Sequence, residues 1–199
     1  MVYLYHLAVL KKEGPKAVLL SLASDLTSFG YFQRRNIQEF MEFTSRMLVE
    51  RTIAGARSSI KQGEYLCHVY TQTNNLAAVL ITDLEYPQRV AQTILNKVLE
   101  DFANNIPVNQ RIPNEPSLLN FRSTLENYLN KYKNPLEADA LTRIQNDVDE
   151  TKIILHQTLE SVLQRGEKLD DLVAKSEDLS RSSKHFYKAA RKTNSCCKL

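Results

Sequence analysis

A heptad repeat in the last third of the chain is the sequence feature that most constrains its structure. Apolar residues recur there at alternating intervals of three and four positions over about seven heptads. The apolar positions of this seam are Leu141, Ile144, Val148, Leu155, Val162, Leu169, Leu172, Leu179, Phe186 and Ala190. Small polar residues fill the other steps at Thr151, Thr158, Ser176, Ser183 and Thr193. The pattern predicts a long heptad-repeat helix of roughly 80 Å, at about 1.5 Å per residue.

Such a helix requires partners. A third of the seam is small and polar, and an isolated helix gains most of its stability from tertiary packing. We therefore expect the segment to be partly disordered alone.

One seam position, between Val162 and Leu169, holds the charged residue Arg165. A guanidinium buried among apolar layers needs hydrogen-bond acceptors, because its uncompensated desolvation would cost several kcal/mol. Partner helices would have to supply those acceptors. Two other interpretations stay open: Arg165 marks a stutter, or its side chain snorkels from an ordinary homodimeric coil. The adjacent Gly166, which disfavours helix by roughly 1 kcal/mol, is compatible with both.

The first two thirds of the sequence predict an α+β domain. Strand-like runs at residues 2–10, 17–22, 57–60, 65–71 and 76–81 predict five antiparallel strands with turns at Gly14-Pro15, Gln62-Gly63 and residues 73–75. Helical spacing of apolar residues predicts three helices. The first helix follows a candidate N-cap at Asn36 and contains Ile37, Phe40, Met41, Thr44, Met47 and Leu48. The second contains Val90, Ala91, Ile94, Leu95, Val98, Leu99 and Phe102. The third contains Leu118, Phe121, Leu125, Tyr128, Leu129 and Tyr132. Pro135 disfavours helix in the preceding residue and marks a boundary. We expect a domain over residues 1–133, the coiled-coil segment over 138–195 and a tail over 196–199.

Composition and charge exclude several classes of function. The net charge of +3 is small, and basic residues gather only near the C-terminus, which favours a negatively charged membrane surface over nucleic acid as partner. Three cysteines give no disulfide framework, and Cys67 is expected to be a small buried hydrophobe. The apolar start of the chain lacks the basic n-region of a signal peptide, so we interpret it as a strand. The sequence contains no run of 18 apolar residues, so it predicts no membrane-spanning helix.

Catalytic chemistry is not predicted. His6, His68, His156 and His185 are scattered without metal-ligand spacing, and no glycine-rich phosphate loop occurs. We expect no catalytic residues, no metal and no cofactor.

The segments Asp149-Glu150-Thr151-Lys152-Ile153 and Val162-Leu163-Gln164-Arg165-Gly166-Glu167-Lys168-Leu169-Asp170-Asp171-Leu172 resemble the SNARE motif of R-SNAREs. The N-terminal part resembles a longin domain, a five-stranded antiparallel sheet with helices on both faces. Asn194-Ser195-Cys196-Cys197 resembles the end of the lipid-anchored longin R-SNAREs, which lack a transmembrane helix.

This resemblance implies a function in vesicle-membrane docking and fusion. Arg165 would meet three glutamines from partner Q-SNAREs in a four-helix bundle, which a bundle-dissociating ATPase recycles. Cys196 and Cys197 would carry a prenyl chain with a palmitoyl or second prenyl chain. The protein would then lie in the cytosol and on the cytosolic face of Golgi, endoplasmic reticulum, vesicle and endosome or vacuole membranes.

The tail departs from the family pattern, because only Lys198 and Leu199 follow Cys197, where the family has three residues after its prenylated cysteine. Counting back four places makes Cys196 the CaaX cysteine, with a terminal Leu that favours geranylgeranyl, so which cysteine carries which lipid stays open. A single chain gives only reversible anchoring, and a second chain or the basic cluster would strengthen it.

Two questions of function also stay open in the sequence. A non-fusogenic longin adaptor or tether could use the same coil to recruit partners. We further expect the free form to be closed, with the heptad segment and lipid folded back on the longin domain, because an exposed seam and lipid present too much apolar surface. Phe43, at the margin of the first helix's apolar stripe with Phe40, is the predicted autoinhibitory contact; alternatively Phe43 simply reaches the core.

Overall fold

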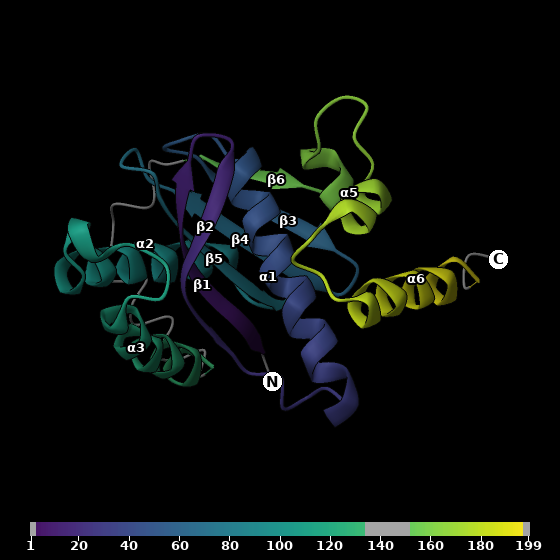
Figure 1. The fold of residues 1–199 in the computed structure, drawn as a ribbon, viewed down its shortest axis with the longest axis horizontal. Coiled ribbons are helices and arrows are strands. Elements are labelled where there is room, and N and C mark those ends of the chain that lie inside the picture. Colours follow the sequence, from purple (N-terminus) through teal and green to yellow (C-terminus); the bar gives the residue numbers. More distant parts are fainter. Residues whose placement is uncertain (1–2, 134–151, 197–199) are drawn as a thin grey trace.

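The computed structural model describes residues 3–133 and 152–196, which form a twisted sheet covered on both faces (Figure 1). The strand order is β2-β1-β5-β4-β3-β6. The first five strands pair antiparallel, and β6 pairs parallel with β3. The strands are β1 (Leu4–Glu13), β2 (Lys16–Ser24), β3 (Arg57–Gln62), β4 (Tyr65–Thr71), β5 (Leu76–Asp83) and β6 (Ile153–His156). The predicted α+β class and its five antiparallel strands are confirmed; the sixth, parallel strand makes the sheet mixed.

The hairpin turns lie where the sequence predicts them. Gly14 and Gly63 have φ angles of 61° and 60°, in the left-handed region that glycine adopts without a steric penalty. Asn75 has a φ of 66° in the turn before β5, and the side-chain oxygen of Asn74 accepts a hydrogen bond from the Leu76 amide at 3.0 Å. Asparagine tolerates this geometry better than other non-glycine residues.

Each face of the sheet packs against different helices, because successive strand residues point to opposite sides. One cluster of buried residues contains Leu7 and Val9 of β1 with α2 (Gln88–Asn105) and α3 (Pro116–Tyr132). The other contains Ala8 and Leu10 with α1 (Arg34–Arg51). The sheet therefore holds α1 on the face opposite to α2 and α3 (Figure 1).

The first helix begins earlier than its predicted N-cap. A 3₁₀ turn, η1 (Tyr31–Gln33), leads directly into α1 at Arg34, and Gln33 occupies the cap position. Asn36, the predicted cap, lies within the first turn of α1. Its side-chain oxygen accepts hydrogen bonds from Ser182 at 2.9 Å and Ser183 at 3.2 Å, so a long-range contact uses the group that was expected to cap the helix.

The heptad segment does not form the predicted single helix in the isolated chain. From residue 152 it forms β6, a 3₁₀ turn η4 (Leu159–Val162), α5 (Leu169–Lys175) and α6 (Arg181–Cys196). Without partner helices its apolar residues pack on the domain instead, and Gly166 turns the chain with a φ of 90° that a helix does not contain. Three seam positions, Leu141, Ile144 and Val148, lie outside the described residues.

Candidate regulatory interface between the domain and the C-terminal segment

The C-terminal segment, here residues 152–196, first contacts the domain through its backbone. Residues 57–60 of β3 pair in order with residues 153–156 of β6. Beyond β6, the Leu159 amide donates a hydrogen bond to the side-chain oxygen of Gln62 at 3.2 Å. An edge strand offers unpaired amides and carbonyls. In this chain the C-terminal segment covers that edge.

Apolar side chains then continue the interface over α1. Leu169 and Leu179, two positions of the seam, are only 2% and 4% exposed and belong to the same buried cluster as Met41 and Leu48 of α1. Leu159 and Val173 are equally buried although they lie outside the seam. The seam residues Val162, Leu172 and Phe186 are half-buried against this cluster, whereas Leu155 and Ala190 are exposed. The interface thus uses one side of each short element and only part of the seam.

The predicted contact residues Phe40 and Phe43 lie on the side of α1 that the C-terminal segment covers. The Phe40 ring stacks on Tyr187 of α6, with ring centroids 5.3 Å apart, and its centroid is 6.0 Å from that of Phe43. Phe43 is half-buried and lines a groove of mixed polarity together with Met47 and Leu172. Both phenylalanines therefore stand between the domain core and the C-terminal segment.

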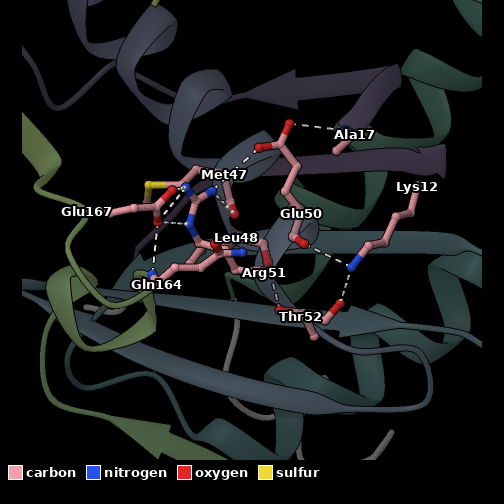
Figure 2. Close-up of polar contacts among 9 residues, drawn as sticks. All are labelled: Lys12, Ala17, Met47, Leu48, Glu50, Arg51, Thr52, Gln164 and Glu167. Atoms are coloured by element: carbon pink, nitrogen blue, oxygen red, sulfur yellow. Dashed lines mark hydrogen bonds and ion pairs between the residues drawn. The ribbon is translucent and has the colours of Figure 1, made fainter. Parts of the chain in front are cut away.

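An arginine near the end of α1 holds the turn before α5 (Figure 2). Arg51 donates to both carboxylate oxygens of Glu167, from Nη2 at 2.9 and 3.0 Å and from Nε at 3.2 Å. The backbone amide of Gln164 also donates to this carboxylate at 2.9 Å. This bond lowers the pKa of Glu167 most, and the bonds from Arg51 lower it further. The bidentate geometry fixes orientation as well as distance.

The end of α1 that presents Arg51 is itself fixed by the hairpin of β1 and β2 (Figure 2). Lys12 donates from Nζ to the carbonyl oxygens of Glu50 at 2.9 Å and Thr52 at 2.7 Å. The Glu50 side chain accepts from the Ala17 amide at 3.2 Å. A lysine beside the last carbonyls of a helix satisfies groups that have no partner within the helix. These bonds hold the backbone from which the Arg51 side chain extends.

A second carboxylate of α1 binds the start of α6. Glu39 accepts from the Ser180 amide at 2.9 Å and from the Ser183 hydroxyl at 2.7 Å. Partial burial acts to raise the pKa of Glu39, but the hydrogen bonds from Ser180, Ser183 and Arg35 outweigh it and lower the pKa to about 2. A carboxylate at a helix N-terminus also has a favourable interaction with the helix dipole. Farther along α1, Arg46 pairs with Asp178 at 3.0 Å.

The remaining sequence-predicted site residues are Arg165 and the cysteine pair. Arg165 is exposed on the turn beside Gly166. Cys196 is the last residue of α6 and Cys197 lies outside the described residues. Cys67 is buried and free, and burial raises its pKa to about 12, which makes it an unreactive core residue.

Within the described residues, no side chains gather into a metal centre. His6 and His68 are buried, and burial lowers their pKa values to about 4 and about 3, so both are neutral packing residues at pH 7. Within residues 3–133 and 152–196 no cluster of histidine, cysteine or acidic residues could hold a metal ion. None of the helices described there has the length and apolarity that crossing a membrane requires.

Comparison with known proteins agrees with this two-part arrangement. A longin family model, described as a regulated-SNARE-like domain, matches residues 26–129, and a synaptobrevin model matches residues 140–198. The chain belongs to the longin R-SNARE family. Relatives named synaptobrevin homolog YKT6 are 51% identical in Eremothecium gossypii, 48% in Debaryomyces hansenii and 46% in Saccharomyces cerevisiae, each over 98% of both chains.

Membership of this family confirms the resemblance seen in the sequence and gives the chain its function. It is an R-SNARE of vesicle trafficking, with a longin domain followed by a synaptobrevin-type SNARE segment, and its partners are other SNARE proteins. The family is a non-enzymatic class.

Sequence reasoning did not find the polar part of the interface. The sequence indicated no long-range partner for Glu39 or Glu167 and made Asn36 a candidate N-cap, because the residues that bond them lie more than 110 positions away. The buried Leu159 and Val173 were also missed, since they lie outside the seam. The one signal in the sequence for the backbone contact of β6 was the run Ile153-Ile154-Leu155, because residues of this kind are common in strands.

Proposed function

We propose that this R-SNARE contributes residues 141–193 as one helix to a four-helix bundle with three glutamine-bearing Q-SNARE helices, and that its own longin domain holds the segment inactive until partners bind. The observation that carries the proposal is the burial of Leu169 and Leu179, two seam positions, against α1. A side chain cannot pack against α1 and in a bundle at once. The closed chain and the bundle are therefore competing states of the same residues.

The competition has a definite energetic scale. Removing a fully buried leucine or valine from its apolar environment costs roughly 1.5–3 kcal/mol, and four such side chains, Leu159, Leu169, Val173 and Leu179, leave the domain on opening. Packing in the bundle would offset the cost of exposing Leu169 and Leu179, because both lie on the seam. Leu159 and Val173 lie outside it, so their burial specifically favours the closed chain.

In the bundle, Arg165 would take the central ionic layer. It is exposed in the closed chain, so its guanidinium loses water only when the bundle forms. Amide oxygens of three glutamines would then replace that water and fix the register of the helices, which is the best-attested role of a buried polar layer. Replacement of a buried ionic group by an apolar one is often neutral or stabilising.

The test of this role is Arg165→Leu in the full chain, with Lys152→Leu as a control at an exposed position outside the seam. Bundles should still form with Arg165→Leu, and partner selectivity and disassembly by the bundle-dissociating ATPase should both decrease. The control should keep both. If Arg165→Leu keeps wild-type selectivity and disassembly, the ionic-layer assignment fails. Lipid mixing between liposomes that carry this chain and the Q-SNARE helices separates fusion from tethering.

We further propose that Cys196 and Cys197 carry a prenyl chain and a palmitoyl or second prenyl chain. These lipids would hold the protein on the cytosolic face of Golgi, endoplasmic reticulum, vesicle and endosome or vacuole membranes, in exchange with the cytosol. Support comes from the cysteine pair beside the basic helix α6, because one lipid with nearby basic residues can give stable binding. Cys196→Ser with Cys197→Ser should move the protein from salt-washed membranes to the cytosolic fraction in cell fractionation. Retention of the double variant on salt-washed membranes would contradict the proposal.

A further inference from the structure

Two aromatic side chains are exposed at the corner where η1 meets α1. Tyr31 is 77% and Phe32 91% exposed, and their rings contact each other edge to face with centroids 5.5 Å apart. Arg34 and Arg35 follow directly in the first turn of α1, which contains no acidic residue. We call these four residues the aromatic corner. Such a pair of exposed rings gains nothing for the stability of the domain.

The loop that carries the corner is ordered by several hydrogen bonds. The Arg34 side chain donates to the carbonyl oxygens of Phe29 at 3.1 Å and Thr27 at 3.2 Å, and the Gln33 amide donates to Gly30 at 2.9 Å. At the base of the loop, Phe29 packs against Tyr5, with centroids 5.3 Å apart. The two rings are thus presented to solvent by a fixed loop. Any ligand that binds them meets little of the entropic cost of ordering them.

The local charge also departs from what a stable helix would choose. Arginines in the first turn of a helix face the positive end of its dipole, which is mildly unfavourable. Nearby acidic groups are already engaged: Asp25 by Lys133 and Thr27, and Glu39 by Arg35 and the serines of α6. The corner therefore presents two rings beside Arg34, whose positive charge has no carboxylate partner among these contacts, and beside Arg35, which pairs with Glu39.

Helix α6 begins next to the aromatic corner and is rich in basic residues, of which Arg191 pairs with Asp170 and Glu160. Its first turn lies against that of α1, because Ser182 and Ser183 bond Asn36 and the Ser180 amide bonds Glu39. Arg181 directly follows Ser180, whose amide bonds the Glu39 carboxylate that Arg35 also contacts. Residues 181–196 contain five basic residues, Arg181, Lys184, Lys188, Arg191 and Lys192, and no acidic one. The helix ends at Cys196.

We propose that the aromatic corner is a membrane-contact site through which the closed chain docks on anionic lipid headgroups. Tyrosine and phenylalanine rings insert at the boundary between headgroups and acyl chains, and arginine binds the phosphates there. The basic residues of the neighbouring helix α6, which contains no acidic residue, favour a negatively charged surface as the partner of this corner. The occupant is therefore an anionic bilayer.

A tryptophan reporter tests the site directly, because the chain contains no tryptophan. Full-length, unlipidated Phe32→Trp is mixed with phosphatidylcholine vesicles that contain roughly 30% phosphatidylserine, and with vesicles of phosphatidylcholine alone. Val108→Trp is the matched control, since Val108 is 75% exposed in η2 (Val108–Gln110) between α2 and α3. We expect a blue shift of the emission only for Phe32→Trp and only with the anionic vesicles. No shift for Phe32→Trp, or an equal shift for both variants, would overturn the proposal.

Vesicle co-sedimentation then measures the contribution of each part. Tyr31→Ser with Phe32→Ser should lower the partition coefficient at least fivefold, and Arg35→Gln about fivefold, the factor expected for one basic residue near a charged surface. Leu119→Ser, at another exposed apolar position, should change it less than twofold. Wild-type partition of the aromatic variant would overturn the proposal, as would binding to protein-containing membranes but not to lipid vesicles. Bundle assembly with Q-SNARE helices should be unchanged in the aromatic variant, so failure here is distinguishable from failure of the proposed function.

Discussion

At the scale of single residues, the bond between Arg51 and Glu167 links the domain to the turn that precedes α5. Most surface ion pairs contribute little, because solvent screens them and two long side chains must be ordered. This pair differs in being bidentate, with the Arg51 side chain 11% exposed and its helix end fixed by Lys12. Arg51 also lies in the last turn of α1, where the helix dipole favours a cation. The turn that contains Arg165 and Gly166 is thereby held beside the domain.

Glu167→Gln should weaken the closed state without affecting the fold of the domain. The amide keeps one acceptor but loses the charge and the bidentate geometry, and with partial exposure we expect a loss of about 1 kcal/mol, or roughly a fivefold larger open fraction. Hydrogen exchange of residues 159–175 should accelerate by that factor. Glu177→Gln, at an exposed position on the same segment, serves as the control. Equal exchange in wild type and Glu167→Gln would show that the pair contributes nothing to closure.

At the scale of elements, residues 153–156 illustrate the limit of reading this sequence alone. Their place in a heptad repeat predicts helix, and in the closed chain they form β6 on the edge of β3. The run of Ile153, Ile154 and Leu155 is compatible with a helix and with a strand, so the available partner determines which one forms. Three partner helices would favour the helix, whereas the unpaired edge of β3 favours the strand. Period alone therefore identifies an apolar seam but cannot fix the conformation of a segment that exchanges partners.

Proline substitutions in β6 should detach it from the sheet. Only alternate residues of an edge strand donate their amides to the neighbouring strand, so either Ile154→Pro or Leu155→Pro must remove a donor to β3. That variant should increase hydrogen exchange in residues 57–60, which are otherwise paired on both sides. Gln157→Pro, directly after the strand, is the control. If neither variant raises exchange at β3, the pairing of β6 with β3 does not persist in solution.

At the scale of the whole molecule, the longin domain was predictable and its relation to the C-terminal segment was predictable only in outline. The strand-like apolar runs of β1 and β5 and the helical spacing in α1, α2 and α3 identified the core, because local patterns and tertiary burial agree there. Exposed apolar surface predicted that the segment folds back, and Phe40 and Phe43 were selected as contacts. The path of the segment was not predictable, since Glu167, Ser180 and Ser183 bond residues far away in sequence whose positions only the fold determines.

Phe43→Glu should shift the whole molecule from closed to open. Phe43 is half-buried against the apolar cluster that joins the two parts and lines one groove with Met47 of α1 and Leu172 of α5, so a glutamate there places a charge against that cluster. A poorly compensated polar group costs about 1–3 kcal/mol at such a site, and opening the segment relieves it by exposing the carboxylate to water. Because the wild-type side chain is not fully buried, the domain itself should keep its melting temperature. Leu119→Glu, at an exposed position of α3, controls for the added charge.

Three measurements on these variants give a consistent test of the switch. Small-angle scattering should show a larger radius of gyration for Phe43→Glu than for wild type and Leu119→Glu. Hydrogen exchange should rise in residues 159–186 but not in β1 or β5, and the association rate with Q-SNARE helices should increase in proportion to the open fraction. An unchanged association rate in a variant that is demonstrably extended would mean that closure does not limit partner binding. Wild type that is already extended would show that the burial of Leu169 and Leu179 does not hold the free chain closed, and the longin domain would then lose its proposed regulatory role.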